Sequence, residues 1–228
     1  MDNKLIYLDN NATTKVDEKV LEEMLPYFCE NYANPGGMYD FAGHVGKKIQ
    51  EAREAVKDFM GANDAKEIYF TGSGSEGANT AIRGVVNSTV GKKHIITTKV
   101  EHPCVLNTYK DLEKQGHKVT YLGVDADGNL NFKELENAIR PETALVSLMA
   151  ANNETGIIFP YEKVAEIVKQ INPETKVFVD AVQAAGKIKM DFKNTKVDFA
   201  SISGHKFHAP KGIGALYVKA GTAFSPLI

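Results

Sequence analysis

The feature of this sequence that most constrains its fold is the alternation, from residue 67 onward, of short apolar runs with amphipathic segments. The apolar runs have the length of buried strands, and the segments between them have helical spacing. The predicted strands cover 68–71, 94–98, 118–122, 144–150, 176–180, 197–202 and 212–218, and the predicted helices between them cover 75–86, 103–115, 132–139 and 161–171. Strands that alternate with helices build a mostly parallel sheet covered on both faces. We therefore expect an α/β fold, a three-layer α-β-α sandwich, whose last two strands permit an antiparallel member.

The residues before this series are predicted to form a short segment and two helices. The helices cover 17–31 and 42–60, with a loop rich in glycine and proline at 34–37 between them. A chain of 228 residues can hold one large α/β domain or two small ones. We expect residues 1–14 to form an N-terminal segment and residues 15–228 to form one large domain.

Composition excludes several classes of protein. Hydrophobic residues make up 43% of the chain and charged residues 25%, which are values of globular proteins. The net charge of −2 gives no electrostatic reason to expect a nucleic acid partner. No apolar run reaches the roughly 18 residues of a membrane span, and the polar start is unlike a signal peptide. Cys29 and Cys104 suit buried or partly buried thiols in a reducing cytoplasm. We expect a cytoplasmic protein without a membrane or nucleic acid partner.

The segment from Ser201 to Leu216 places one lysine where a reactive amine is useful. Lys206 is expected on a tight connection between the last two strands, at the rim of the sheet. A partly desolvated lysine loses its proton more easily and can form a Schiff base with an aldehyde. Viewed alone, Lys206 also suits a solvated loop lysine.

A glycine-rich turn follows the first predicted strand, at residues 71–79, and opens a helix. Free N–H groups and the helix dipole favour a phosphate there, bound by the Gly74 amide and by the amide and hydroxyl of Ser75. The spacing of the glycines matches neither a P-loop nor a Rossmann dinucleotide turn. Glycine-rich turns between strand and helix are also common without a ligand.

Polar residues follow three further strands. Asp180 ends an apolar strand, and its carboxylate could pair with a protonated pyridine ring, with Gln183 donating to the phenolic oxygen of that ring. His102 could cover a planar ring or move a proton, and Asn153 could donate to the same oxygen. Each has an ordinary alternative: a helix N-cap for Asp180, a packed or solvated loop histidine for His102, and a turn for Asn153.

Together these residues meet the requirements of one cofactor, pyridoxal 5′-phosphate. They supply a phosphate cup, a pyridine counter-ion, a ring cover, two partners for the ring oxygen and a Schiff-base lysine. Ser203 and His205, which precede the lysine, offer further donors to the phosphate. All of these residues follow predicted strands, where ligands gather in a parallel sheet.

The chain resembles the fold-type I pyridoxal-phosphate enzymes of the class V aminotransferase group, and most closely the cysteine desulfurases of the NifS/IscS kind. The matching segments are Tyr7–Thr14, residues 71–79, Glu101-His102, Asn152–Gly156, Val179–Gln183, Ser203–Lys206 and Pro210–Ala215. The resemblance implies that Lys206 bonds to the cofactor and that His102 stacks on the ring as an acid or base. It implies Asp180 on the pyridine nitrogen and Asn153 and Gln183 on the ring oxygen. The implied phosphate ligands are Gly74, Ser75, Ser203 and His205.

The reaction implied by the resemblance converts L-cysteine to L-alanine. The amine of Lys206, released by the substrate, removes the α-proton, and a cysteine thiolate of the enzyme takes the sulfur as a persulfide. In the family this thiolate belongs to a mobile loop beyond Phe224–Ile228, where this sequence ends. We therefore expect the large cofactor domain of a longer enzyme, without its C-terminal small domain. Cys104 suits a packed thiol better than a substitute nucleophile.

Three functions remain open on the sequence alone. The first is a cysteine desulfurase domain that acts on L-cysteine, forms a homodimer and delivers sulfur to an acceptor or to an iron–sulfur scaffold protein. The second keeps pyridoxal phosphate but changes the substrate, as in a selenocysteine lyase or another class V lyase or transferase. The third is a non-catalytic remnant that dimerises or binds a partner. No metal site is expected.

Overall fold

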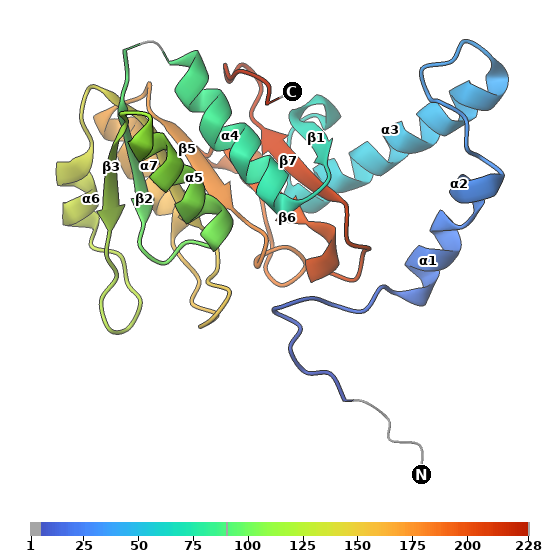
Figure 1. Cartoon of the computed structure of the whole chain (residues 1–228), viewed down its shortest axis with the longest axis horizontal. Helices are drawn as coiled ribbons and strands as arrows, with labels where there is room; N and C mark the ends of the chain where they lie inside the picture. Colours follow the sequence, from blue (N-terminus) through green and yellow to red (C-terminus); the bar gives the residue numbers. More distant parts are fainter. Residues whose placement is uncertain (1–5, 90, 228) are drawn as a thin grey trace.

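A mixed sheet forms the centre of the computed structural model, which describes residues 6–89 and 91–227. Within this part of the chain the sheet has seven strands in the order β1-β7-β6-β5-β4-β2-β3 (Figure 1). The strands are β1 (Ile68–Thr71), β2 (His94–Thr98), β3 (Lys118–Leu122), β4 (Thr143–Met149), β5 (Lys176–Asp180), β6 (Phe199–Ser203) and β7 (Gly214–Val218). Only β7 runs antiparallel to its neighbours, β1 and β6, among these strands. The prediction of a mostly parallel sheet is therefore confirmed, and its last strand is the antiparallel member.

Helices cover both faces of the sheet. The helices are α1 (Glu18–Met24), α2 (Pro26–Cys29), α3 (Asp40–Met60), α4 (Gly74–Ser88), α5 (Pro103–Lys114), α6 (Phe132–Ala138) and α7 (Tyr161–Ile171). The buried side chains of α4 and α5 join one apolar core, and those of α6, α7 and the end of α3 join another on the opposite face. These two cores confirm the three-layer α-β-α sandwich.

The strands are apolar on both faces because each face contacts a layer of helices. In β5, Val177 and Val179 pack in the core beneath α6 and α7, whereas Phe178 between them packs in the core beneath α4 and α5. Successive side chains of a strand point to opposite faces, so a strand buried on both sides reads as a continuous apolar run. This is why the apolar runs located the strands well.

The N-terminal part differs from the prediction of one helix over 17–31. The structure has two short helices, because α1 ends at Met24 and Pro26 opens α2. Proline has no N–H to donate and its ring clashes with the preceding turn, so a continuous helix is broken there. Neither helix has a buried residue, and Cys29 on α2 is exposed, which corrects the expectation of a buried or partly buried thiol. Figure 1 shows both helices below the outer part of α3, away from the sheet.

The directions of the strands determine where loops meet. Strands β1, β2, β4, β5 and β6 run the same way, so their carboxyl ends share one edge of the sheet. The polar residues that follow these strands are therefore brought together from distant parts of the sequence.

None of the helices in the described ranges combines the length and apolar character needed to cross a bilayer.

Candidate active site

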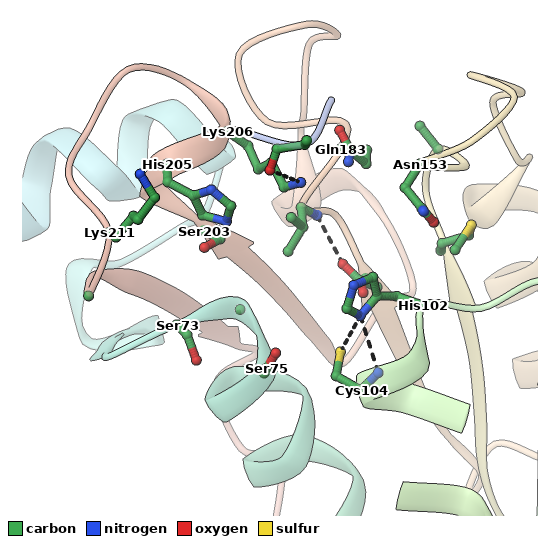
Figure 2. Close-up of a pocket in the computed structure, with 17 residues that line it drawn as sticks. Ser73, Ser75, His102, Cys104, Asn153, Gln183, Ser203, His205, Lys206 and Lys211 are labelled. Atoms are coloured by element: carbon green, nitrogen blue, oxygen red, sulfur yellow. Dashed lines mark hydrogen bonds between the residues drawn. The ribbon is translucent and has the colours of Figure 1, made fainter. Parts of the chain in front are cut away.

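A cavity of about 380 Å³ lies at the edge of the sheet where these carboxyl ends meet. Every residue that the sequence predicted for the site lines it: Gly74, Ser75, His102, Asn153, Asp180, Gln183, Ser203, His205 and Lys206. Figure 2 shows these side chains arriving from separate elements, with Ser73 and Ser75 at the start of α4 and His102 before α5. The structure therefore brings the predicted set together, while the role of each residue stays a prediction.

Lys206 lies on a short 3₁₀ turn, Gly204–Lys206, between β6 and β7. Its Nζ donates hydrogen bonds to the backbone carbonyls of Asn11 and of Ala12, the second at 3.0 Å. Burial lowers the pKa of Lys206, as does the nearby charge of Lys187, and the carboxylate of Asp180 opposes the change. The amine therefore loses its proton more readily than an exposed lysine does.

Asp180 ends β5 at the floor of the cavity, with only 6% of its surface exposed. Its Oδ1 accepts a hydrogen bond of 3.0 Å from the Val182 amide. Burial raises the pKa of Asp180, and this hydrogen bond and the charges of His102 and Lys206 pull it back down. A buried carboxyl group of this kind favours a positively charged partner.

The two amides predicted for a ring oxygen are already engaged. Gln183 donates from Nε2 to the Asn11 carbonyl at 2.9 Å and accepts from Lys187 Nζ at 3.1 Å. Asn153 donates from Nδ2 to Glu154 Oε1 at 2.6 Å. Both side chains line the cavity, and each amide NH₂ group has a second N–H that can donate to a ligand.

His102 is the N-cap of α5, and its ring is oriented by Cys104. The ring Nδ1 accepts from the Cys104 amide at 3.2 Å and lies 3.0 Å from Cys104 Sγ (Figure 2). An acceptor at Nδ1 leaves the proton of a neutral ring on Nε2. Burial raises the pKa of the Cys104 thiol to about 11. A thiol that keeps its proton is a poor nucleophile, which agrees with the expectation of a packed cysteine.

The opposite side of the cavity is formed by the first turn of α4. Ser73 caps the helix by accepting from the Glu76 amide at 3.1 Å, and the amides of the first turn have no partner within a helix. A Cβ atom added at Gly74 would lie 2.6 Å from Val182 Cγ2 and 3.3 Å from Ser203 Cβ. Glycine therefore allows the helix end to approach β5 and β6, and it leaves a positive dipole end at the cavity.

Sequence reasoning missed two features of the site. The carbonyls of residues 11 and 12 contact Lys206, although no local pattern pointed to them. Glu101 is 4% exposed, and burial raises its pKa to about 8. The sequence shows Glu101 between a predicted strand and His102, but it does not show how deeply the carboxyl group is buried.

The profile of the family described as aminotransferase class-V matches residues 6–227. The chain belongs to this family. It is 53% identical over 225 residues to a cysteine desulfurase of Trichormus azollae, covering 98% of this chain and 55% of that protein. A solved "NifS-like protein" superimposes with a TM-score of 0.95 at 45% identity, covering 98% of this chain and 61% of that one. The structure titled "SspA in complex with cysteine" gives a TM-score of 0.93 at 38% identity, with coverage of 98% and 65%.

These matches confirm the resemblance to cysteine desulfurases, a group that depends on pyridoxal phosphate. The chain spans about half the length of the curated relatives that it matches. Its family and fold are therefore established. That this chain takes part in the activity of a full-length relative is a proposal.

Proposed function

We propose that this chain binds pyridoxal 5′-phosphate and acts as the cofactor domain, residues 15–228, of a cysteine desulfurase. The observation that carries the proposal is the position of Lys206 and Asp180 on one cavity, opposite the first turn of α4. A reactive amine, a buried acid and an anion-binding helix end are the groups that a phosphorylated pyridine aldehyde requires.

The residues present fit this cofactor. The cavity volume lies within the roughly 300–1,000 Å³ of small-molecule sites. Gly74 keeps open the approach to the helix end, which a side chain at that position would obstruct. Burial raises the pKa of Asp180, and the positive charge of Lys206 opposes this change. A protonated ring nitrogen carries the same positive charge and would favour the Asp180 carboxylate in the same way.

The residues divide into a covalent partner, a ring site and a phosphate site. Lys206 would bond to the cofactor, and Asp180 would pair with its ring nitrogen. Asn153 and Gln183 would each donate a second amide N–H to the ring oxygen, and His102 would cover the ring. The phosphate would contact the amide of Gly74 and the side chains of Ser75, Ser203 and His205.

The protein supplies proton transfer and electrostatics around the cofactor. The bound cofactor would act as an electron sink for charge that develops on the substrate α-carbon. Lys206 Nζ, with its lowered pKa, can hold or take up a proton at the cavity. Asp180 is kept from water, and its carboxylate would keep a neighbouring ring nitrogen protonated, because an opposite charge favours the charged form. Cys104 keeps its proton, so we assign the sulfur-accepting thiol elsewhere in the assembled enzyme.

We further propose L-cysteine as the substrate, a homodimer as the working form, and a sulfur acceptor or iron–sulfur scaffold protein as the partner. Identity to cysteine desulfurases supports the substrate, and one structurally similar protein carries cysteine in its title. Exposed apolar side chains at Leu21 on α1, at Leu25 between the two helices and at Phe28 on α2 support an interface at that end of the molecule.

The test is covalent capture of the cofactor. Purified chain mixed with pyridoxal phosphate should develop the visible absorbance of a lysine-bound cofactor. Borohydride reduction followed by peptide mass spectrometry should then locate the label on Lys206. Lys206→Ala should abolish the band, whereas Lys118→Ala, at an exposed position on β3, should leave it unchanged.

Two results would contradict the proposal. One is a well-folded wild-type chain that gives no band, which would favour a non-catalytic, partner-binding role. The other is a label on a lysine outside the cavity. Titration of the loaded chain with L-cysteine and with L-selenocysteine then separates the two substrates, and a spectral response to selenocysteine alone would favour a lyase for that amino acid.

A further inference from the structure

The segment Tyr7–Thr14 belongs to the sequence resemblance, but the proposed function gives it no role. The structure places the part from Asn11 to Asp17 along the loop that carries Lys206. Its contacts with residues 205–208 join positions 191 to 195 apart in the sequence. We name residues 11–17 the clasp.

Thr14 is the centre of the clasp and is 6% exposed. Its amide donates to the His205 carbonyl at 2.9 Å, and its hydroxyl donates to the same carbonyl at 3.0 Å. The hydroxyl also accepts from the His208 amide at 2.7 Å. One threonine side chain therefore contacts the backbone on both sides of Lys206.

His208 forms the second attachment point. Its φ of +68° lies in the left-handed region, which is costly for a residue with a side chain. The His208 carbonyl accepts from the Asp17 amide at 3.0 Å, and its ring Nδ1 lies 3.0 Å from the Lys15 carbonyl. These contacts with the clasp hold the backbone of His208 in a conformation that it would not adopt alone.

The other end of the clasp reaches the reactive amine itself. The carbonyls of Asn11 and Ala12 accept from Lys206 Nζ, and the Asn11 carbonyl also accepts from Gln183. Thr13 Oγ1 lies 3.1 Å from the ring Nδ1 of His205. Lys206, Gln183 and His205, three predicted cofactor residues, thus contact one short segment of backbone.

We propose that the clasp positions the lysine loop for the cofactor and that Thr14 is its central positioning residue. The carbonyls of Asn11 and Ala12 accept hydrogen bonds from the Lys206 amine, and they hold it in one position whenever it is not bonded to the cofactor. The hydrogen bonds of Thr14 and His208 fix the position of the lysine loop relative to the cavity. They thereby fix the position of His205 at the phosphate site. This inference rests on the proposed function, because its consequence is measured as cofactor binding.

The test compares Thr14→Val with Thr14→Ser in the full chain. Valine has nearly the shape of threonine but loses the hydroxyl, so both hydrogen bonds of that group are lost. We expect Thr14→Val to weaken pyridoxal phosphate binding about tenfold or more in equilibrium dialysis, and Thr14→Ser to stay within about threefold of wild type. Hydrogen exchange should rise at the amides of Asp17 and His208 in the valine variant alone.

Thr175→Val is the matched control. Thr175 is fully buried, and its hydroxyl donates to the Thr143 carbonyl at 2.8 Å, on the opposite edge of the sheet. This variant should lower the melting temperature without changing cofactor affinity. Its behaviour separates a general loss of stability from a loss of lysine positioning.

Three outcomes would overturn the inference. These are a folded Thr14→Val chain with wild-type affinity, a Thr14→Ser chain as weak as the valine variant, or a Thr175→Val chain with the same loss of affinity. If Thr14→Val does not fold, Thr13→Val decides, because Thr13 is only partly buried and its hydroxyl is the clasp's contact with the His205 ring at the proposed phosphate site. Unchanged affinity in Thr13→Val would reject the clasp as the element that positions His205. A wild-type chain that binds no cofactor would instead reject the proposed function.

Discussion

Glu101 Oε1 lies 2.6 Å from the hydroxyl of Thr98, which donates to it, and it also accepts from the Met149 amide at 3.0 Å. The second oxygen, Oε2, is buried and has no hydrogen-bond partner among the described residues. Burial raises the pKa of Glu101 from 4.5 to about 8, with a smaller contribution from the charge of Asp180. Glu101 is therefore a protonated acid at neutral pH, directly before His102.

The first prediction concerns the pH dependence that Glu101 imposes on folding. Because its pKa is raised in the folded state, the stability associated with its protonated form is complete below pH 4.5 and is lost as pH rises to about 8. Glu101→Gln keeps an oxygen for Thr98 and Met149 and cannot ionise. Relative to wild type, this variant should gain roughly 2–4 kcal/mol of unfolding free energy between pH 5 and pH 9.

Urea unfolding of the cofactor-free chain across this pH range measures the effect. Glu113→Gln is the control, because Glu113 is an exposed glutamate whose carboxylate accepts from Tyr121 on the surface. If the difference in unfolding free energy between Glu101→Gln and wild type does not change with pH, Glu101 is ionised across the whole pH range.

The second prediction separates stability from cofactor binding at Asp180. Asparagine can keep the hydrogen bond from the Val182 amide while removing the acid whose pKa burial raises. Asp180→Asn should therefore leave the cofactor-free chain at least as stable as wild type at pH 8. The same change should weaken pyridoxal phosphate binding by about tenfold or more, because the ring nitrogen loses its counter-ion.

Thermal unfolding and equilibrium dialysis of the same preparation measure the two effects. A large loss of stability in the cofactor-free variant would show that Asp180 is a structural acid. Unchanged affinity would remove it from the cofactor site.

The third prediction concerns acid unfolding and a residue at the opposite edge of the sheet. His94 opens β2 with its ring buried, Nδ1 lying 2.8 Å from Thr143 Oγ1 and Nε2 lying 2.9 Å from Thr120 Oγ1. Burial lowers the pKa of His94, so the stability that it contributes is present above its unfolded value of 6.5 and is lost as pH falls further.

His94→Gln should therefore flatten the loss of stability below pH 6.5 while costing about 1–2 kcal/mol at pH 8, where the wild-type hydrogen bonds are intact. His44→Gln on α3, an exposed site, provides the comparison. Acid unfolding curves that coincide for wild type and His94→Gln would assign the acid sensitivity to other groups.

The sequence located the sheet well, and it selected residues that line one cavity, for a physical reason. Strands such as β4 and β5 are buried on both faces, so their apolar runs are distinct from the helices around them. In a parallel sheet the residues after such strands must share an edge, which is why Asp180 and Asn153 could be assigned to one cavity.

What the sequence could not supply were contacts between distant backbone groups. The carbonyls of Asn11 and Ala12 have the same chemistry as any other carbonyl, and only the folded chain brings them to Lys206. The present partners of Gln183 and Asn153 likewise depend on side-chain orientation. The break between α1 and α2 was different, because Pro26 was visible and its effect on a helix was overlooked.

The last prediction uses the space around Gly74. A methyl group there would lie 2.6 Å from Val182 Cγ2, too close for a normal contact. Gly74→Ala should therefore cost about 1–3 kcal/mol of unfolding free energy and push the first turn of α4 away from β6. Cofactor affinity should fall with it, because the amides of that turn no longer reach the phosphate.

The double variant Gly74→Ala, Val182→Ala tests this geometry directly. Removing the valine methyl groups clears the nearest contact, although Ser203 Cβ at 3.3 Å remains. We expect the double variant to recover at least half of the affinity lost by Gly74→Ala, expressed as free energy, whereas Val182→Ala alone should change affinity little. Strictly additive losses in this double-mutant cycle would mean that Gly74 and Val182 do not interact and that the glycine is needed only for its own backbone.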